Sequence, residues 1–513
     1  MCNVLYKIAS KVLANRLKII LPEIVAEEQS AFVPGRLITD NIITAFECLH
    51  FMKGNKAKKN NFCALKLDMR KAYDRIEWSY LRAIMSKLGF HQQWVDMVMR
   101  PVSTVSFSIL FNGVKSEKFA PSRGLRQGDP ISPYLFLLAA EGLSSLIKDR
   151  CESSALQGVK VAESAPVISH LLFADDCLLF FKANLESVNH IRDVLELYCN
   201  ASGQRVNLDK SSIFFSKGCS EALRHDIKDW LDVHQETLNE KYLGMPIDVG
   251  RDKNGKLQFL KDRIWKRVQG WFEKTLSAAA KDVLIKSVAQ AIPTYSMSCF
   301  RLPRGLCQEI NSIVRKFWWG CKAGERKACW VAWSDMTKPR YMGGLGFRDI
   351  ELFNLALLAR QAWRVLQSPD SLSARILKAR YFPATEFLQA DLGSRPSQVW
   401  RAILDGRDTL KQGIIKRIGT GEATDPWNDN WLPRDGRLRP IACLAAHAPS
   451  RVSEFIDRTS ATWNCEKLKE CFPADGCGGD SEPPFVDQEP AGRVGLALRP
   501  QRDFIVRPVY KML

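Results

Sequence analysis

Residues 171–181, LLFADDCLLFF, constrain the fold more than any other stretch, because they set two adjacent acids inside a run of large apolar residues. Burying one unpaired carboxylate costs several kcal/mol, and a like-charged neighbour increases that cost. Asp175 and Asp176 must therefore face water, pair with cations or bind metal. The run predicts two strands around a tight turn at these acids. A solvent-exposed hairpin turn, where Asp is common, is the simplest alternative.

A third acid, Asp68, has the same setting, since it ends the apolar strand FCALKLD at 62–68. Taken alone, it is equally well explained as a helix N-cap. If the two strands lie side by side, however, Asp68 meets Asp175 and Asp176. Magnesium prefers such oxygen ligands and keeps positions open for substrate phosphates. Two ions about 3.5–4 Å apart would then stabilise an in-line phosphoryl transfer.

The loop at 121–136, PSRGLRQGDPISPYLF, predicts a tight turn before a helix. Its backbone N–H groups, with Arg123 or Arg126, could meet phosphates. The alternative is a plain turn followed by a helix capped by Ser132.

Helices are also predicted at 79–89 and at the start of the chain, where Leu5, Ile8, Ala9, Val12 and Leu13 share a helical spacing. Helices on one face of an antiparallel sheet, an α+β layer, fit this order of elements.

Charge indicates the class of partner. The formal net charge is +18 and the sequence pI is about 9.3, and a basic surface concentrates polyanions such as nucleic acid. An anionic membrane is a weaker candidate, because the sequence lacks an apolar run of membrane-spanning length and a signal peptide. A soluble basic protein without such a partner is the plain alternative. Hydrophobic residues make up 46% of the chain, which excludes a wholly disordered protein.

Six motifs occur in a specific order, and together they resemble the reverse transcriptases of plant non-LTR (LINE-type) retrotransposons. They are QSAFVPGR at 29–36, LDMRKAYDRIEW at 67–78, GLRQGDPISPYLF at 124–136, FADD at 173–176, SGQRVNLDKSSIFFS at 202–216 and YLGMPI at 242–247. The resemblance covers about residues 1–470. It suggests a chain truncated at its N-terminus, since the upstream endonuclease of such elements and part of the fingers are missing.

The resemblance implies an α+β right-hand polymerase with fingers, palm and thumb, and a mainly helical C-terminal extension. The implied parts are partial fingers at 1–60, the palm with remaining fingers elements at 61–248, a thumb-like helical region at 249–345, a Trp-rich extension at 346–472 and a poorly packed tail at 473–513.

The implied activity is that of an RNA-directed DNA polymerase, a nucleotidyltransferase that adds dNTPs to a primer 3′-OH by two-metal chemistry. Asp68 and Asp175 would hold the metals, Asp176 would assist, and the carbonyl of Met69 would complete a metal shell. Tyr73 stands where the family has an aromatic gate against the ribose 2′-OH. Weaker assignments to nucleotide binding are Gln127, Arg36 and Lys210.

The implied cofactors are two Mg²⁺ ions, with Mn²⁺ as an alternative. The implied partners are an RNA template, a DNA primer or target and dNTPs, with no membrane. The family resemblance places the chain in the nucleus and leaves its oligomeric state open.

Three alternative functions remain. The first is a catalytically inactive nucleic-acid-binding relic of such an element. The second is an RNA-dependent RNA polymerase, which Tyr73 opposes, and the third is the related group II intron maturase.

Overall fold

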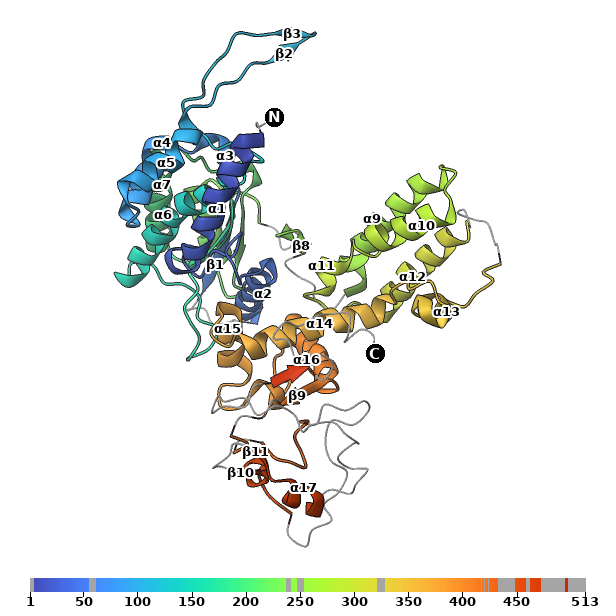
Figure 1. The fold of residues 1–513 in the computed structure, drawn as a ribbon. Helices are drawn as coiled ribbons and strands as arrows, with labels where there is room; N and C mark the ends of the chain where they lie inside the picture. The colour runs from blue at the N-terminus through green and yellow to red at the C-terminus, as the bar shows by residue number, and fades with distance from the viewer. Residues whose placement is uncertain are drawn as a thin grey trace. The chain divides into compact units, whose positions relative to one another are not determined.

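The computed structural model describes residues 4–54, 61–236, 241–246, 253–320, 328–416, shorter stretches between 418 and 471, and 494–496 (Figure 1). The chain divides into two compact units. The first comprises Met1–Arg251 with Ser368–Val399, and the second comprises Asp252–Gln367 with Trp400–Leu513. A segment beyond residue 367 is thus part of the first unit. The tail predicted to be unpacked lies almost entirely outside the described residues.

The first unit holds a four-stranded antiparallel sheet of order β4-β5-β1-β6, surrounded by helices. Its elements are α1 (Val4–Ile24), α2 (Ile38–Gly54), β1 (Phe62–Leu67), α3 (Ala72–Arg75), α4 (Trp78–Lys87), α5 (Gln92–Ser103), β2 (Leu110–Phe111), β3 (Val114–Lys115), α6 (Ser132–Glu152), β4 (His170–Phe173), β5 (Asp176–Lys182), α7 (Leu185–Ser202), β6 (Ser212–Phe215), α8 (Glu221–Leu231), β7 (Lys241–Tyr242), β8 (Met245–Pro246) and α15 (Leu372–Tyr381). The predicted α+β layer is confirmed.

One face of this sheet packs against α6 and α7, and its residues make up most of the core that they form together. Successive strand residues point to opposite faces, so alternate positions of β1 and β5 enter the same core. The cross-strand pairs Cys63↔Phe181, Leu65↔Leu179 and Leu67↔Cys177 all belong to it. This alternation leaves Lys66, Asp68 and Asp176 on the opposite face.

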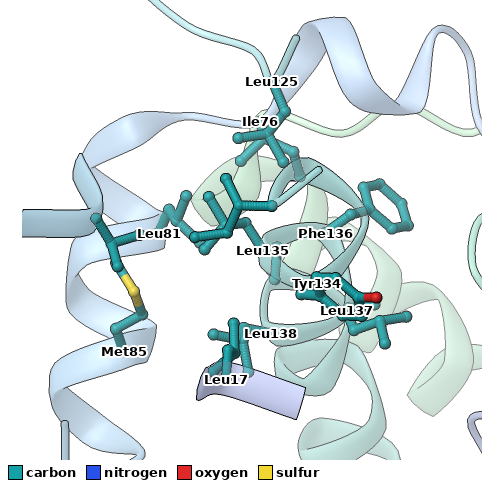
Figure 2. Packing of buried hydrophobic residues seen from close by; sticks show 14 of the residues in the cluster. Leu17, Ile76, Leu81, Met85, Leu125, Tyr134, Leu135, Phe136, Leu137 and Leu138 are labelled. Atoms are coloured by element: carbon teal, nitrogen blue, oxygen red, sulfur yellow. The ribbon is translucent and has the colours of Figure 1, made fainter. Parts of the chain in front are cut away.

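A second core joins α1, α4 and α6 (Figure 2). Leu17 of α1 approaches Leu138 of α6, while Leu81 and Met85 of α4 face the same helix. The predicted apolar face of the first helix is wrong for Leu5, Ile8, Ala9 and Val12, which are exposed, and right only for Leu13. The face of this helix that is buried carries Ser10, Leu13, Ala14, Leu17 and Leu21. The first turns of this helix carry apolar residues on two faces, so their sequence alone does not predict which face is buried.

Two predicted helix starts also need correction. Helix α4 begins at Trp78 after Glu77, so Ser79 lies inside it. Helix α6 has Ile131 at its N-cap without a side-chain capping bond, and Ser132 is its first residue. Each helix starts slightly earlier because its first turn is held by contacts with other segments; the N–H of Ile131, for example, donates to Ser10 Oγ (3.1 Å).

Helix α15 packs against α2 through a buried polar cluster formed by Glu47, His50, Arg380, Tyr381 and Ser397. Arg380 Nη1 lies 3.1 Å from Glu47 Oε2. Tyr381 OH donates to the same oxygen (2.7 Å), and Ser397 Oγ donates to Glu47 Oε1. Arg380 Nη2 donates to His50 Nδ1 (2.7 Å), which is unprotonated because burial and the neighbouring arginine lower the His50 pKa to about 4.

The second unit is mainly helical in its described residues. Its elements are α9 (Lys253–Phe272), α10 (Ala278–Leu284), α11 (Thr294–Met297), α12 (Arg304–Trp318), α13 (Trp333–Thr337), α14 (Ile350–Gln367), α16 (Gln398–Lys411, which starts at the boundary), β9 (Ile414–Lys416), β10 (Ile456–Asp457), β11 (Thr462–Trp463), α17 (Cys465–Cys471) and β12 (Val494–Leu496). Among the described residues of either unit, no helix is long and apolar enough to cross a membrane.

Candidate active site

The register of the central strands brings the distant acids together. β1 and β5 are antiparallel neighbours, and Leu67 pairs with Cys177. The next position along both strands therefore sets Asp68 opposite Asp176, on the same face of the sheet. Helix α3 follows Lys71, which is its N-cap, so the alternative that Asp68 caps a helix is wrong. This single strand pairing brings together two acids, Asp68 and Asp176, that lie more than one hundred residues apart in the sequence.

Asp175 occupies the turn between β4 and β5, where it is exposed beside the half-buried Asp176. The turn is held from outside: Gln29 Oε1 accepts from the N–H of Ala174 (3.1 Å), and Asn41 Nδ2 donates to the carbonyl of Leu172 (2.7 Å). Ala174 has φ 55°, a backbone conformation that costs an L-residue about 1–2 kcal/mol. The surrounding bonds thus maintain a turn that would be unfavourable in isolation.

Asp68 is fixed by the segment that precedes β6. Asn207 Nδ2 donates to Asp68 Oδ2 (3.0 Å), and the Asn207 N–H donates to the Asp68 carbonyl (2.7 Å). Met69 forms an antiparallel bridge with Val206, in which Asp68 and Arg70 make the hydrogen bonds. Backbone groups of adjacent residues in such a bridge point to opposite sides. The Met69 carbonyl therefore points away from this segment, toward the β5 side of β1.

The acids repel one another. The pKa of Asp176 is raised, first by burial and then by the charge of Asp175, with a smaller contribution from Asp68. Lys66 opposes this rise from the same face of β1, while its Nζ also donates to the carbonyl of Lys241 (3.0 Å). Across the described part of the chain, none of the three carboxylates forms an ion pair within 4 Å. The site therefore concentrates negative charge that Lys66 offsets only in part.

The donor set fits a hard divalent cation in its chemistry. Among the described residues, no three His, Cys, Asp or Glu side chains enclose a metal position by themselves. Magnesium, however, takes only one or two protein carboxylates and completes its shell with water and substrate phosphates. Asp68, Asp175 and the Met69 carbonyl lie at two adjacent strand ends and would supply oxygen ligands to such an ion.

Tyr73 lies beside these acids. Its ring stacks on Phe136 of α6, with centroids 4.8 Å apart and planes 9° from parallel. Burial raises the pKa of Tyr73 to about 12, and the charge of Asp175 adds to the rise. Tyr73 therefore stays protonated at neutral pH, and Phe136 holds its ring against helix α6.

The loop that carries Gln127 is attached to the segment after β1. The Leu125 N–H donates to the Tyr73 carbonyl (2.7 Å), and the Trp78 indole donates to the Gly124 carbonyl (2.8 Å). Gly124 has φ +88°, and an added Cβ would lie 2.7 Å from the Asp74 carbonyl oxygen. Only glycine allows this close approach. Gln127, whose side chain is exposed, follows two residues after the Leu125 N–H that bonds the Tyr73 carbonyl.

Arg36 and Lys210 have different surroundings. The Arg36 guanidinium donates to the carbonyls of Ala26, Gln29, Val25 and Pro22, so it holds the chain where α1 ends. This structural role accounts for the arginine without a nucleotide, and its triphosphate contact stays a prediction. Lys210 is exposed in the 3₁₀ turn after Asn207, within the segment that contacts Asp68.

Sequence reasoning missed several positioning residues. Asn207 holds Asp68, Gln29 and Asn41 hold the turn of Asp175, and Asp129 accepts hydrogen bonds from Tyr6 and Ser10 of α1. The available signal was weak: a polar residue inside each of the motifs QSAFVPGR, RQGDP and SGQRVNLDK. Their partners are more than one hundred residues away, so spacing along the chain could not identify them.

Comparison with known proteins places these features in a family. Residues 1–247 match the family described as reverse transcriptase (RNA-dependent DNA polymerase). An uncharacterized mitochondrial protein of Arabidopsis thaliana is 43% identical over 152 residues, which is 29% of this chain and 99% of that protein. An uncharacterized 149 kDa protein of transposon TX1 from Xenopus laevis is 27% identical over 347 residues, 66% of this chain and 25% of that protein.

A retrovirus-related Pol polyprotein from an R2 retrotransposable element of Drosophila melanogaster is 28% identical over 152 residues, 30% of this chain and 14% of that protein. This chain thus spans a minor part of its longer relatives. Telomerase from Candida tropicalis, solved with a fragment of telomeric RNA, has a TM-score of 0.35 at 12% identity over 78% of this chain and 56% of that one, too low to bear on the fold.

The family match includes β1, the hairpin of Asp175 and the Asn207 segment, and it confirms the right-hand polymerase assignment. The relatives named for transposable elements confirm the resemblance drawn from the motifs. Residues 1–247 are therefore a reverse transcriptase (RNA-dependent DNA polymerase) domain, and the relatives named for transposable elements agree with a non-LTR, LINE-type origin.

Proposed function

We propose that this chain is the polymerising core of a LINE-type element, which adds dNTPs to a primer 3′-OH as directed by an RNA template. The observation that carries the proposal is the pairing of Leu67 with Cys177, because it sets Asp68 opposite Asp176 beside the turn of Asp175. Such a group of acids, without a compensating ion pair, suits the two-metal transfer of a nucleotidyl group.

In this proposal, Asp68, Asp175 and the Met69 carbonyl hold two Mg²⁺ ions, with Mn²⁺ as a substitute, and Asp176 assists them. Bound ions would lower the pKa of the primer hydroxyl and stabilise charge on the leaving pyrophosphate. Asn207 keeps Asp68 in one orientation. The bonds from Gln29 and Asn41 keep Asp175 at the end of its strand, so the acids need no rearrangement when substrate arrives.

The nucleotide would lie between this edge of the sheet and the loop after Gly124. We propose that the stacked ring of Tyr73 closes the space that a ribose 2′-OH would need, so dNTPs are preferred over NTPs. Gln127 would position the nucleotide from the loop, and Lys210 would give a proton to pyrophosphate. Arg36 would contribute to triphosphate binding only if it released the carbonyls that it now contacts, so we rank it last.

The proposed partners are an RNA template, a DNA primer or target, and dNTPs. The net charge of +18 supports a polyanionic partner. We further propose that the chain acts in the nucleus, where its DNA target would be. Imaging of a tagged chain tests this location; accumulation in mitochondria, the compartment named for one Arabidopsis relative, would contradict it.

A primer-extension assay tests the function. The purified chain should extend a DNA primer on an RNA template in the presence of Mg²⁺ and dNTPs, and Asp175→Ala should abolish extension. Asp193→Ala removes an exposed acid from α7 and is the matched control. If wild type and Asp175→Ala give equal product, the proposed activity is wrong. RNA binding without extension by wild type would instead favour the inactive relic.

A further inference from the structure

Lys66 is the only charged residue of β1, and every other residue of this strand is buried. Paired strands flank it on both sides, with Leu178 of β5 and Ser212 of β6 directly opposite. A half-buried lysine loses hydration and side-chain freedom in such a place, and an apolar side chain would suit the strand better. Packing of the sheet therefore does not explain this lysine.

Lys66 shares its face of the sheet with the acids. Residues two apart on a strand point the same way, so Lys66 lies on the face of Asp68, and the strand register adds Asp176 from β5. The charge of Lys66 lowers the pKa of Asp176, against the rise caused by burial and by the other two acids. Lys66 therefore acts on the acid group through its positive charge.

The ammonium of Lys66 is tied to a backbone group beside this face. Its Nζ donates to the carbonyl of Lys241 (3.0 Å), the first residue of the hairpin β7–β8. Tyr242 and Met245 anchor this hairpin, because both side chains are fully buried. Among the described residues, none of the three acids forms an ion pair within 4 Å. The lysine thus compensates the acids from a distance and leaves their oxygens uncovered.

A positive charge in this position has two effects of opposite sign. It stabilises the carboxylates in the metal-free protein, because it offsets part of their repulsion. It also repels a divalent cation at the same carboxylates, and this repulsion weakens binding of the ion. Magnesium completes its shell with substrate phosphates where protein carboxylates are few, and a triphosphate adds the negative charge that the lysine has offset.

We propose that Lys66 is a positioning residue that makes stable metal binding at the acids depend on the nucleotide. The proposal rests on the proposed function, since it assumes that Asp68 and Asp175 hold the catalytic ions. With Lys66 present, the acids alone bind a divalent ion weakly, and the triphosphate restores strong binding. The site then takes its ions together with the nucleotide instead of holding them beforehand.

The test titrates Mn²⁺ into the purified chain without nucleotide or primer and follows free Mn²⁺ by electron paramagnetic resonance. Lys66→Met should bind Mn²⁺ about tenfold more tightly than wild type, because a nearby repelling charge is gone. Lys66→Arg keeps the charge and should bind as wild type does. Lys182→Met is the matched control, since Lys182 lies on the same face at the far end of β5. At about 20 Å from Asp176, its charge is screened.

A second measurement compares melting temperatures in EDTA, in Mn²⁺ and in Mn²⁺ with a dNTP. A bound ligand raises the melting temperature. For wild type, most of the rise should require the dNTP. Lys66→Met should melt lower than wild type in EDTA, and Mn²⁺ alone should give most of its rise. Lys66→Gln, which loses the charge but keeps a donor, should behave in the same way and replaces the methionine variant if that variant does not fold.

A neutral Lys66 variant that melts lower than wild type but binds Mn²⁺ no more tightly would overturn the proposal, because the lysine would then serve only the fold. Equal tightening in Lys182→Met would also overturn it, since any lost lysine would then have the effect. Neither measurement involves synthesis. A chain whose Mn²⁺ affinity responds to Lys66 but which never extends a primer would therefore refute the proposed activity alone.

Discussion

Glu47 and the acids at the ends of β1 and β5, all in the first unit, differ in how their charge is compensated. Glu47 is fully buried, yet Arg380, Tyr381 and Ser397 all direct donors at its carboxylate. The acids at the ends of β1 and β5 have no ion pair within 4 Å among the described residues and repel one another. Glu47 has its partners in the protein, whereas the acids at the strand ends are the ones that we propose to bind divalent cations.

The difference distinguishes a structural acid, Glu47, from the acids that we propose to be functional. Burial raises the pKa of Glu47, and Arg380 and the two hydroxyls oppose that rise in part, so the donors that join α15 to α2 also offset some of the cost of burying this acid. Burial also raises the pKa of Asp176, but there the next largest cause, Asp175, acts in the same direction. Repulsion between the carboxylates of Asp175 and Asp176 destabilises the fold, and binding of a cation would relieve it.

The largest expected effect is on catalysis at the uncompensated acids. Asp68→Asn keeps the shape and the contact with Asn207, but it removes a ligand charge, so extension should fall about a thousandfold, or about 4 kcal/mol of transition-state stabilisation. The melting temperature in EDTA should stay level or rise, since repulsion of Asp176 is relieved. A clear drop in that temperature would mean that this acid is structural like Glu47.

The opposite outcome is expected at the compensated acid. Glu47→Gln leaves the Arg380 charge buried without its partner, which should lower the free energy of unfolding by about 3 kcal/mol. Denaturant unfolding measures this change. Glu27→Gln is the matched control, because Glu27 forms a surface ion pair with Arg375, which lies on α15 like Arg380. Loss of this ion pair should lower the free energy of unfolding by about 0.5 kcal/mol. Equal effects of the two variants would remove the distinction between the clusters.

Glu141 is an intermediate case. Its carboxylate accepts from the Ala26 N–H (3.1 Å), and Lys148 lies near, but burial dominates and raises its pKa to about 7. A raised pKa means that the folded state holds the proton more tightly. Its contribution to stability is therefore complete below about pH 4.5 and is lost as pH rises through about 7, a change of about 3 kcal/mol.

Unfolding of wild type and Glu141→Gln between pH 4.5 and 8 measures this loss. The glutamine variant should lack this part of the pH dependence, and its stability relative to wild type should rise toward pH 8. Parallel pH profiles for the two proteins would show that Glu141 does not titrate in this window.

The smallest effect is expected at the residue that orients Asp68. Asn207→Ala removes one hydrogen bond to a ligand carboxylate, so the Mg²⁺ concentration for half-maximal extension should rise about tenfold. Metal titration of the extension rate measures this shift, with the exposed Asn15→Ala as control. An unchanged metal requirement with a lower melting temperature would assign Asn207 to folding alone.

The chemistry of the candidate site was readable from the sequence. Large apolar residues around Asp68, and around Asp175 and Asp176, indicated strands that end in acids, since such residues enter a core and the acids cannot follow. The turn of RQGDP and the aromatic Tyr73 were equally visible. The six motifs then predicted the family, which the comparisons confirm.

Only the tertiary structure decided which segments meet. The register of Leu67 with Cys177, the bonds of Asn207 and Gln29, the exposed face of α1 and the docking of α15 on α2 all join residues far apart in the chain. Local spacing reports the preferences of one helix or strand, but a buried polar group is stable only beside its partner. That partner is chosen by packing of the whole unit, which no single segment encodes.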